Sequence, residues 1–352
     1  MRSSGDTRIE PSALRCFSAE VLKRVGTPTQ DAEQVADCLV EGDLRGIAGH
    51  GAVRLLSYLE RIRQGGCNPK ADVRVVRDGP ATALVDGDGG FGEVAGVRAM
   101  GLAVEKARTY GIGSVLVRNS GPFGAAAYFP MIAVRNDMIG FTTLSTTALI
   151  PPPGGLRASI GNSPMAFGIP AGEERPILLD MALTVASRAR CRTAAMEGRK
   201  IPRDWAVTNE GKPTEDPIEA IEGLLLPIAG YKGYGLAIVM GALTGVLSGG
   251  PFGASTLTPD VPSRVPQTSH YYLALNVASY LPVEEFKSRV DRLIRQQRSV
   301  PTVAGQGPVH VPGEGAWLRK EERLRDGIPM GAALLAELRR MGEDLGITGI
   351  AC

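Results

Sequence analysis

The chain has 352 residues, of which 43% are hydrophobic and 22% charged, and its formal net charge is +2 at pH 7. This composition is ordinary for a globular protein, and the length is sufficient for two domains around a large buried core. The small net charge argues against nucleic-acid binding through bulk electrostatics. The most apolar stretch, GLAIVMGALTGVLSGG, is too short and too rich in glycine to predict a membrane span.

The cysteines and the N-terminus indicate the compartment. Five cysteines, at positions 16, 38, 67, 191 and 352, are scattered without CxxC spacing. This pattern indicates reduced thiols rather than a disulfide framework or a zinc site. The opening residues MRSSGDTRIE lack the apolar core of a signal peptide. We therefore expect a cytoplasmic protein with no metal centre.

Apolar residues recur at helical spacing in the N-terminal part of the chain. Leucines, valines and a phenylalanine at this spacing predict a helix over 11–25. Thr27 and Pro28 form a suitable cap and first-turn pair for a second helix. The segment RGIAGHGAVRLLSYLERIRQGG then predicts a third helix over 50–64, ended by its two glycines.

The rest of the chain mixes strands with helices. Two short strands around a turn are expected in VRVVRDGPATALVDGDGG, and further strands in GSVLVRN, MIGFTTLST, RPILLDMALT and SHYYLALNV. Helices are expected over residues 92–109, 124–136, 184–200, 283–298 and 329–345, and in the segment that begins with GYKGYG. This order lacks the regular alternation that predicts a doubly wound parallel sheet, so we expect a mixed α+β fold.

His50, one of three histidines, stands four residues before Arg54. In a helix over 50–64 the two side chains lie on one face, with His50 in the first turn, where the helix dipole disfavours an imidazolium and favours a bound anion. An arginine can hold a carboxylate with two hydrogen bonds, and a neighbouring histidine can donate a proton to a carbonyl oxygen. The pair therefore suits a 2-oxo acid, although a structural histidine beside a surface arginine has the same spacing.

Other polar and glycine-rich segments also leave two interpretations open. No GxGxxG stands between a strand and a helix, so the Rossmann fingerprint is absent. GYKGYG lacks the GKS or GKT of a P-loop, and its Lys232 can pair with a phosphate or remain solvated. Asp180 ends a predicted strand, where it can bind a ligand or cap a turn. His270 and His310 lack metal-ligand spacing and are expected to be structural or surface groups.

A set of segments, taken in order, resembles the malate/L-lactate dehydrogenase type-2 family over residues 10–350. They are DLRGIAGHGAVRLLSYL, DGDGGFGEVAG, GIGSVLVRNSGPFGAAAYF, GNSPMAFGIP, LLDMALT, LLPIAGYKGYGLAI and VPGEG. Members of that family include ureidoglycolate, sulfolactate and diketogulonate oxidoreductases and piperideine-2-carboxylate reductase. The resemblance implies NAD or NADP, bound on a non-Rossmann fold with an antiparallel-rich sheet, and a homodimer.

The resemblance also implies a division into domains and a set of site residues. Residues 86–282 match the cofactor-binding domain, and residues 1–85 with 283–352 match a helical, substrate-side domain. His50 matches the family's proton-donating histidine, and Arg54 the arginine that holds the substrate carboxylate. Cofactor contacts are implied for Leu178, Leu179, Asp180, Met181, Ala182, Leu183, Thr184, Lys232, Gly233, Gly313 and Glu314.

The chain departs from the family pattern mainly on the substrate side. Gly49 replaces the usual serine before the histidine, and Pro122 replaces a second active-site histidine. Proline has no side-chain donor or acceptor, so it cannot take over the role of that histidine. A glycine-lysine pair has become Ala189–Arg190, which keeps the charge but changes its shape. We therefore expect an atypical substrate.

Three functions follow from these residues. The first is an NAD(P)-dependent oxidoreductase that transfers hydride between the nicotinamide and C2 of a 2-oxo or 2-hydroxy acid or a cyclic 2-imino acid. The second is a non-redox enzyme on the same scaffold, a cyclase, isomerase or lyase with His50 as its acid or base. The third is a catalytically silent cofactor-binding relative. None of the three requires nucleic acid or a membrane.

Overall fold

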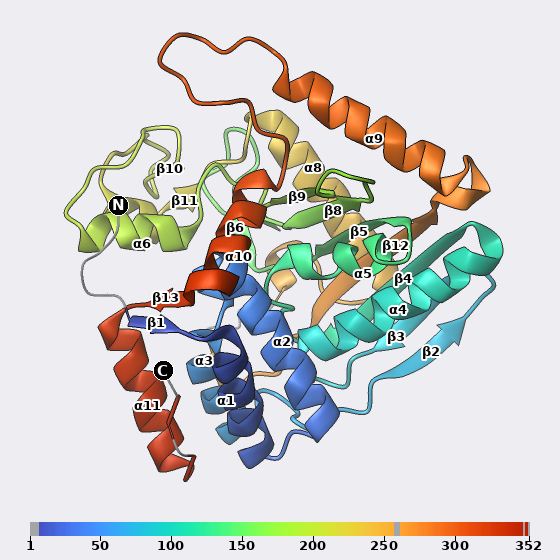
Figure 1. Cartoon of the computed structure of the whole chain (residues 1–352). Helices are drawn as coiled ribbons and strands as arrows, with labels where there is room; N and C mark the ends of the chain where they lie inside the picture. Colours follow the sequence, from blue (N-terminus) through green and yellow to red (C-terminus); the bar gives the residue numbers. More distant parts are fainter. Residues whose placement is uncertain (1–6, 257–260, 348, 351–352) are drawn as a thin grey trace.

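A seven-stranded sheet forms the centre of the molecule, whose structure is a computed structural model that describes residues 7–256, 261–347 and 349–350 (Figure 1). The strand order is β2 (Arg74–Asp78), β3 (Thr82–Asp86), β4 (Ile112–Ser120), β12 (Thr268–Asn276), β5 (Met138–Leu144), β8 (Met165–Ile169) and β9 (Ile177–Met181). Only the β3–β4 pair is parallel. The expected antiparallel-rich, mixed α and β fold is confirmed.

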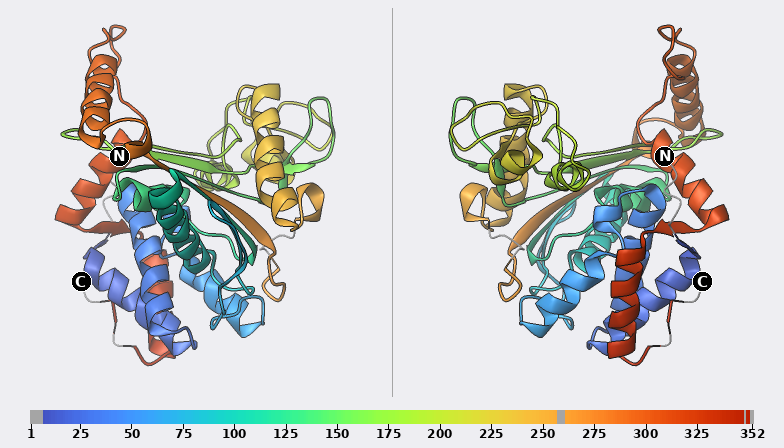
Figure 2. Two further views of the ribbon diagram at one scale, coloured as in Figure 1. Left: turned by 90° about the vertical axis from the view of Figure 1, so that its right-hand side faces the viewer. Right: turned by 90° about the vertical axis from the view of Figure 1, so that its left-hand side faces the viewer.

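Helices cover both faces of this sheet, because its strands alternate apolar residues toward each side. On β12, Tyr272 and Ala274 pack toward α4 (Gly92–Tyr110), whereas Tyr271 and Leu273 pack in a separate cluster with α8 (Tyr231–Gly241). Figure 2 shows α8 on the opposite side of the sheet from α4. The helix α8 runs directly into a π-helical turn, Ala242–Val246.

Helices from both ends of the chain form a second core beside the sheet. They are α1 (Pro11–Arg24), α2 (Thr29–Arg45), α3 (Arg54–Arg63) and α11 (Ala332–Asp344), and they share one cluster of buried apolar side chains. A small sheet of β1 (Thr7–Ile9) and β13 (Ile328–Met330) joins the two ends. Figure 1 shows α11 beside α1 and α3. The two cores do not divide at the predicted positions, because β2 and most of β3 lie before residue 86 but belong to the central sheet, and α9 after residue 282 packs on it. The division at 85/86 and 282/283 therefore stays a prediction.

The remaining elements are shorter helices and strands between those already named, together with two longer helices near the C-terminal end. They are η2 (Ala126–Tyr128), α5 (Pro130–Val134), β6 (Ala148–Ile150), β7 (Ile160–Gly161), α6 (Arg188–Met196), β10 (Ala206–Val207), α7 (Pro217–Glu222), β11 (Leu224–Leu225), η4 (Gly253–Ser255), η5 (Val277–Ser279), α9 (Val283–Arg298) and α10 (Glu314–Asp326). Val290 and Ile294 of α9 pack on Ile169 and Ile177 of the last two strands. In this way α9 covers the edge of the sheet.

Several predicted helices have different bounds in the structure. The helix expected over 124–136 is split at Phe129 into η2 and α5, and the one over 184–200 is the shorter α6. Pro130 opens α5 because a proline lacks the N–H that a helix interior requires. Thr27 does not cap α2, since Pro28 stands at the cap position, and the Thr27 hydroxyl is buried without a hydrogen-bond partner.

Neither a membrane span nor a metal cluster is found in the part of the chain that the structure describes. No described helix is long and apolar enough to cross a bilayer. No three His, Cys, Asp or Glu side chains among the described residues come together as a metal site.

Candidate active site

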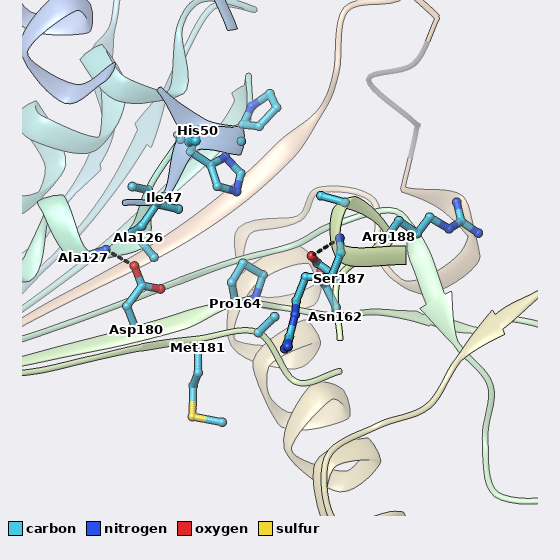
Figure 3. A pocket seen from close by; sticks show the side chains of 18 of the residues that line it. Ile47, His50, Ala126, Ala127, Asn162, Pro164, Asp180, Met181, Ser187 and Arg188 are labelled. Atoms are coloured by element: carbon cyan, nitrogen blue, oxygen red, sulfur yellow. Dashed lines mark hydrogen bonds between the residues drawn. The ribbon is translucent and has the colours of Figure 1, made fainter. Parts of the chain in front are cut away.

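A cleft of about 1480 Å³ lies between the helical core and the end of the sheet at β9. One wall is the segment 45–57 between α2 and α3, which includes the short helix η1 (Ala48–His50). The other walls include the loop 122–127, the end of β9, the start of α6 and the start of α10 with the residues before it. Figure 3 shows His50 on one side of this space and Ser187 and Arg188 on the other. Elements far apart in the sequence therefore enclose one site.

His50 and Arg54 both line the cleft, but they do not share one helix. His50 ends η1, and α3 begins only at Arg54. The predicted helix over 50–64 was therefore wrong in its first turn, because the backbone is extended at Gly51. The Nδ1 atom of His50 and the Nε atom of Arg54 are buried without a hydrogen-bond partner. Two unsatisfied groups of this kind indicate a site for a polar ligand.

The surroundings of His50 hold its imidazole neutral at pH 7. Burial is the main cause that lowers its pKa to about 4, and the positive charge of Arg54 lowers it further. The helix-dipole explanation proposed from the sequence does not apply, since His50 does not lie in the first turn of α3. A neutral histidine can accept a proton.

Asp43 fixes the segment that carries His50. Its carboxylate accepts a hydrogen bond of 2.7 Å from the backbone N–H of Ala52. A Cβ atom on Gly51 would stand 1.8 Å from the Asp43 Oδ1 atom, and one on Gly42 would stand 2.8 Å from the His50 carbonyl oxygen. Only glycine at these two positions allows α2 to approach the segment so closely.

Among the described residues that line the cleft, Asp180 supplies the single carboxylate. Its Oδ2 atom accepts a hydrogen bond of 2.9 Å from the backbone N–H of Ala127, which Figure 3 shows as a dashed line. The surrounding cleft walls desolvate this side chain and raise its pKa. Asp180 therefore joins the end of β9 to the loop 122–127, and it remains accessible from the cleft.

The structure brings only part of the predicted cofactor contacts to the cleft. Leu178, Leu179, Asp180, Met181, Ala182 and Gly313 line it, together with His50 and Arg54. Leu183, Thr184, Lys232, Gly233 and Glu314 are not among its lining residues.

The predicted contacts outside the lining have other surroundings. Leu183 is fully buried, and Thr184 forms a β-bridge with Pro227. Lys232 is exposed in the first turn of α8. Glu314 accepts a hydrogen bond of 2.8 Å from the Val311 N–H and forms an ion pair with Arg298.

Sequence reasoning missed most of the cationic groups of the cleft. The lining includes Arg45, Arg188, Arg190, Arg192, Arg199 and Arg319 besides Arg54. Arg45 is almost fully buried, pairs with Glu41 at 2.7 Å and lies 4.2 Å from the centre of the Trp317 ring. Besides Arg54, only Arg190 was singled out from the sequence, although the run SRARCR holds three arginines within five residues.

A buried polar pair lies behind Arg54. The Tyr58 hydroxyl, one turn further along α3, donates a 2.5 Å hydrogen bond to Glu93. Glu93 is fully buried, and burial raises its pKa, whereas the Tyr58 bond and the charge of Arg54 act in the opposite direction. A Cβ atom on Gly124, which lines the cleft, would lie 3.2 Å from Glu93 Oε1. The pair therefore supports two walls of the cleft at once.

Pro122 also lines the cleft, and a buried histidine stands behind its loop. His270 is fully buried, and its Nε2 atom lies 2.9 Å from the carbonyl oxygen of Gly121. Burial lowers the His270 pKa to about 3. His270 thus supports the loop from behind and does not face the cleft in place of Pro122. His310 lies at the surface, 3.2 Å from Glu314.

The cleft fits a nicotinamide dinucleotide in size and in charge. Ligand pockets for drug-sized molecules measure roughly 300–1,000 Å³, so a larger cleft accommodates a dinucleotide with a small acid. Its described lining holds seven arginines against the single carboxylate of Asp180. The orphaned Nε atoms of Arg54 and Arg188 are donors that an anionic ligand can satisfy.

Comparisons with known proteins agree with this fit. The family model described as malate/L-lactate dehydrogenase matches residues 9–339. A malate dehydrogenase of Pyrococcus abyssi is 37% identical over 97% of this chain and 96% of its own length. The NAD(+)-dependent ureidoglycolate dehydrogenase of Escherichia coli K12 is 32% identical over 91% of this chain and 92% of its own.

The fold agrees as well. The solved structure of sulfolactate dehydrogenase from Methanocaldococcus jannaschii superposes with a TM-score of 0.92 at 34% identity, covering 98% of both chains. The chain therefore belongs to the malate/L-lactate dehydrogenase family, and with it to the NAD- or NADP-dependent oxidoreductases.

Proposed function

We propose that the chain transfers a hydride between a nicotinamide cofactor and C2 of a 2-oxo or 2-hydroxy acid, or of a cyclic 2-imino acid. The observation that carries this proposal is the position of His50 and Arg54 on one wall of the cleft, each with a buried nitrogen that has no partner. A substrate would satisfy both groups, with its carboxylate at Arg54 and the oxygen or nitrogen of the adjacent carbon at His50.

Arg54 and His50 have complementary roles in this proposal. Arg54 binds the substrate carboxylate and so orients C2. Neutral His50 accepts the hydroxyl proton when the acid is oxidised and returns it in the reverse direction. The nicotinamide, when bound, supplies or accepts the hydride. A carboxylate on Arg54 cancels the charge that helps to lower the His50 pKa, so substrate binding shifts that pKa back toward its ordinary value.

The cofactor side of the cleft is proposed to be the end of β9 and the segment before α10. Leu178, Leu179, Asp180, Met181, Ala182 and Gly313 would contact the cofactor directly. Gly313 has a φ of +92°, and a Cβ atom there would lie 2.6 Å from the Leu178 carbonyl oxygen, so only glycine keeps the segment against β9. Leu183, Thr184, Lys232, Gly233 and Glu314 lie outside the lining and stay proposed members of this region.

The substrate is proposed to differ from lactate and malate. Pro122 lines the cleft without a polar side-chain atom, and Gly49 adds no hydroxyl beside His50. A Cβ atom on Gly49 would meet nothing within 4 Å, so the position leaves open space near the histidine. A substrate that is larger or less polar than lactate fits these two changes.

A homodimer is proposed, with α8 in its interface. Apolar side chains are exposed along α8, its π-helical extension and the residue after it: Leu236, Ile238, Val239, Val246 and Leu247 are 40% to 60% exposed. A helix that is hydrophobic all round is normally buried on all sides. A second copy of the chain would cover this face.

Given the reduced thiols and the small-molecule substrate, a cytoplasmic location stays our proposal.

Variants of the two central residues test this function. With a panel of 2-oxo acids and cyclic imines, His50→Asn is expected to lower kcat by a factor of about 10² to 10⁴, as for loss of a general acid–base. Arg54→Leu is expected to raise KM by about tenfold to a hundredfold, as for loss of a charge-assisted contact. Arg289→Leu, an exposed position on α9, is the matched control and should change neither value. Wild-type rates in both site variants would refute the proposal.

A further inference from the structure

Three arginines enter the cleft lining from the start of α6. Arg188, Arg190 and Arg192 all line the cleft, and no described acidic side chain forms an ion pair with any of them. Arg199, which also lines the cleft, differs because it is paired with Glu197. The function proposed above uses Arg54 but leaves these three positive charges unexplained.

The arrangement at the start of α6 is unfavourable without an anion. Arg188 and Arg192 are one turn apart on the same helix face, where like charges destabilise a helix. Arg188 opens the helix, where the dipole is positive, and the first turn contains no acidic residue. The Nε atom of Arg188 is also buried without a hydrogen-bond partner. A bound anion would offset the repulsion between the arginines and the positive helix end, and it would accept a hydrogen bond from the unpaired donor.

Arg190 adds a flat surface to this group. Its guanidinium lies 4.5 Å from the centre of the Trp205 ring, and both residues line the cleft. Stacked guanidinium and aromatic groups are typical platforms for a nucleobase. The same corner of the cleft therefore offers a platform for a base next to an excess of positive charge.

We infer that the start of α6 binds the 2′-phosphate of the adenosine half of NADP, so that this chain prefers NADP to NAD. The inference rests on the proposed function, which places the reacting end of the cofactor at His50 and Arg54. Figure 3 shows His50 across the cleft from Ser187 and Arg188 at the start of α6. A phosphate monoester brings nearly two negative charges to this corner. NAD carries no phosphate on the ribose 2′ position, so it would leave these charges unmatched.

Binding titrations with the full chain test this inference without turnover. We would measure Kd for NADPH and NADH by fluorescence in wild type, in Arg188→Gln/Arg192→Gln and in the remote control Arg289→Gln. Adenosine 2′,5′-bisphosphate and 5′-AMP serve as competitors that differ only in the 2′-phosphate. We expect wild type and Arg289→Gln to bind NADPH at least about tenfold more tightly than NADH, and the double variant to lose this difference by weakening NADPH alone.

The other outcomes overturn the inference. If the double variant weakens NADPH and NADH by the same factor, the arginines bind the pyrophosphate common to both cofactors. If it weakens neither, the arginines form only a solvated helix face. If wild type binds NADH as tightly as NADPH, the cofactor preference is refuted while the proposed oxidoreductase stands. If wild type binds neither cofactor, the proposed function fails together with the inference.

Discussion

The Asp43 carboxylate accepts a 2.7 Å hydrogen bond from the Ala52 backbone N–H, and this bond ties the segment that carries His50 to α2. Asp43 is buried, and this burial raises its pKa to about 6. The histidine is therefore positioned by the contact with α2 rather than by the first turn of α3. The geometry of the proposed proton transfer depends on how closely the segment and α2 approach each other.

A methyl group at Gly51 is expected to disrupt this approach. In Gly51→Ala the new Cβ would stand 1.8 Å from Asp43 Oδ1 and would displace the carboxylate. We expect a loss of at least about 2 kcal/mol in the free energy of unfolding, measured with denaturant, and a lower kcat. Gly49→Ala is the matched control, since its Cβ meets nothing within 4 Å. Equal stability of the two variants would contradict the tight contact with Asp43.

The charge of Arg54 is expected to have a measurable effect on the pKa of His50. In Arg54→Leu the His50 pKa should rise from about 4, because one of its two depressing causes is removed while burial, the larger one, remains. Only three histidines are present, so NMR titration of the imidazole protons can follow each. His270, whose pKa is lowered to about 3 by burial, is the internal control and should not change. An unchanged His50 pKa would show that Arg54 does not act on it.

The apolar face of α8 is expected to control assembly. Val239→Glu with Leu247→Glu places two charges on side chains that are 50% and 60% exposed in the single chain. If this face is the dimer interface, analytical ultracentrifugation should find a dimer in wild type and a monomer in the double variant, because unpaired charges would be buried. Leu324→Glu, at an exposed position on α10, should leave the dimer intact. If the double variant stays dimeric, the interface lies elsewhere. If wild type is a monomer, the proposed dimer is excluded.

Pro122→His tests whether the missing histidine reflects a changed substrate. If the cleft is adapted to a substrate other than lactate or malate, the new imidazole should not raise kcat/KM for the native substrate, since it fills space that the substrate uses. The steady-state rates of wild type and variant with the best substrate of the panel decide this. A large increase in the variant would show that Pro122 is a damaging change.

The sequence predicted those elements that local pattern alone determines. The helix over 283–298 was predicted to the residue, because its apolar positions keep strict helical spacing and Pro282 stands at its start. The strands at 112–120 and 138–144 followed from their apolar runs, although their neighbours in the sheet come from distant parts of the chain. The helix Glu314–Asp326 was missed, because it has no apolar stripe: Trp317 packs against a core cluster, whereas Leu318 and Leu324 are exposed.

The site was harder to predict than the fold. The pair His50 and Arg54 was identified correctly as neighbours, but its helical geometry was wrong, because Asp43 and two glycines impose an extended turn that no local pattern encodes. The arginines of α6 join the cleft only through the path of the chain after β9, which single-sequence patterns do not reveal.

Transfer of deuterium from cofactor to product tests the central claim most directly. NADH and NADPH deuterated at the transferring C4 position would be incubated with wild type and a panel of 2-oxo acids and cyclic imines, and the products analysed by mass spectrometry and NMR. We expect one deuterium at C2 of the product, with a rate that falls by a factor of about 10² or more in His50→Asn. Bound cofactor with no deuterated product from any substrate would contradict hydride transfer at this cleft and would favour redox-free chemistry or a silent binding protein.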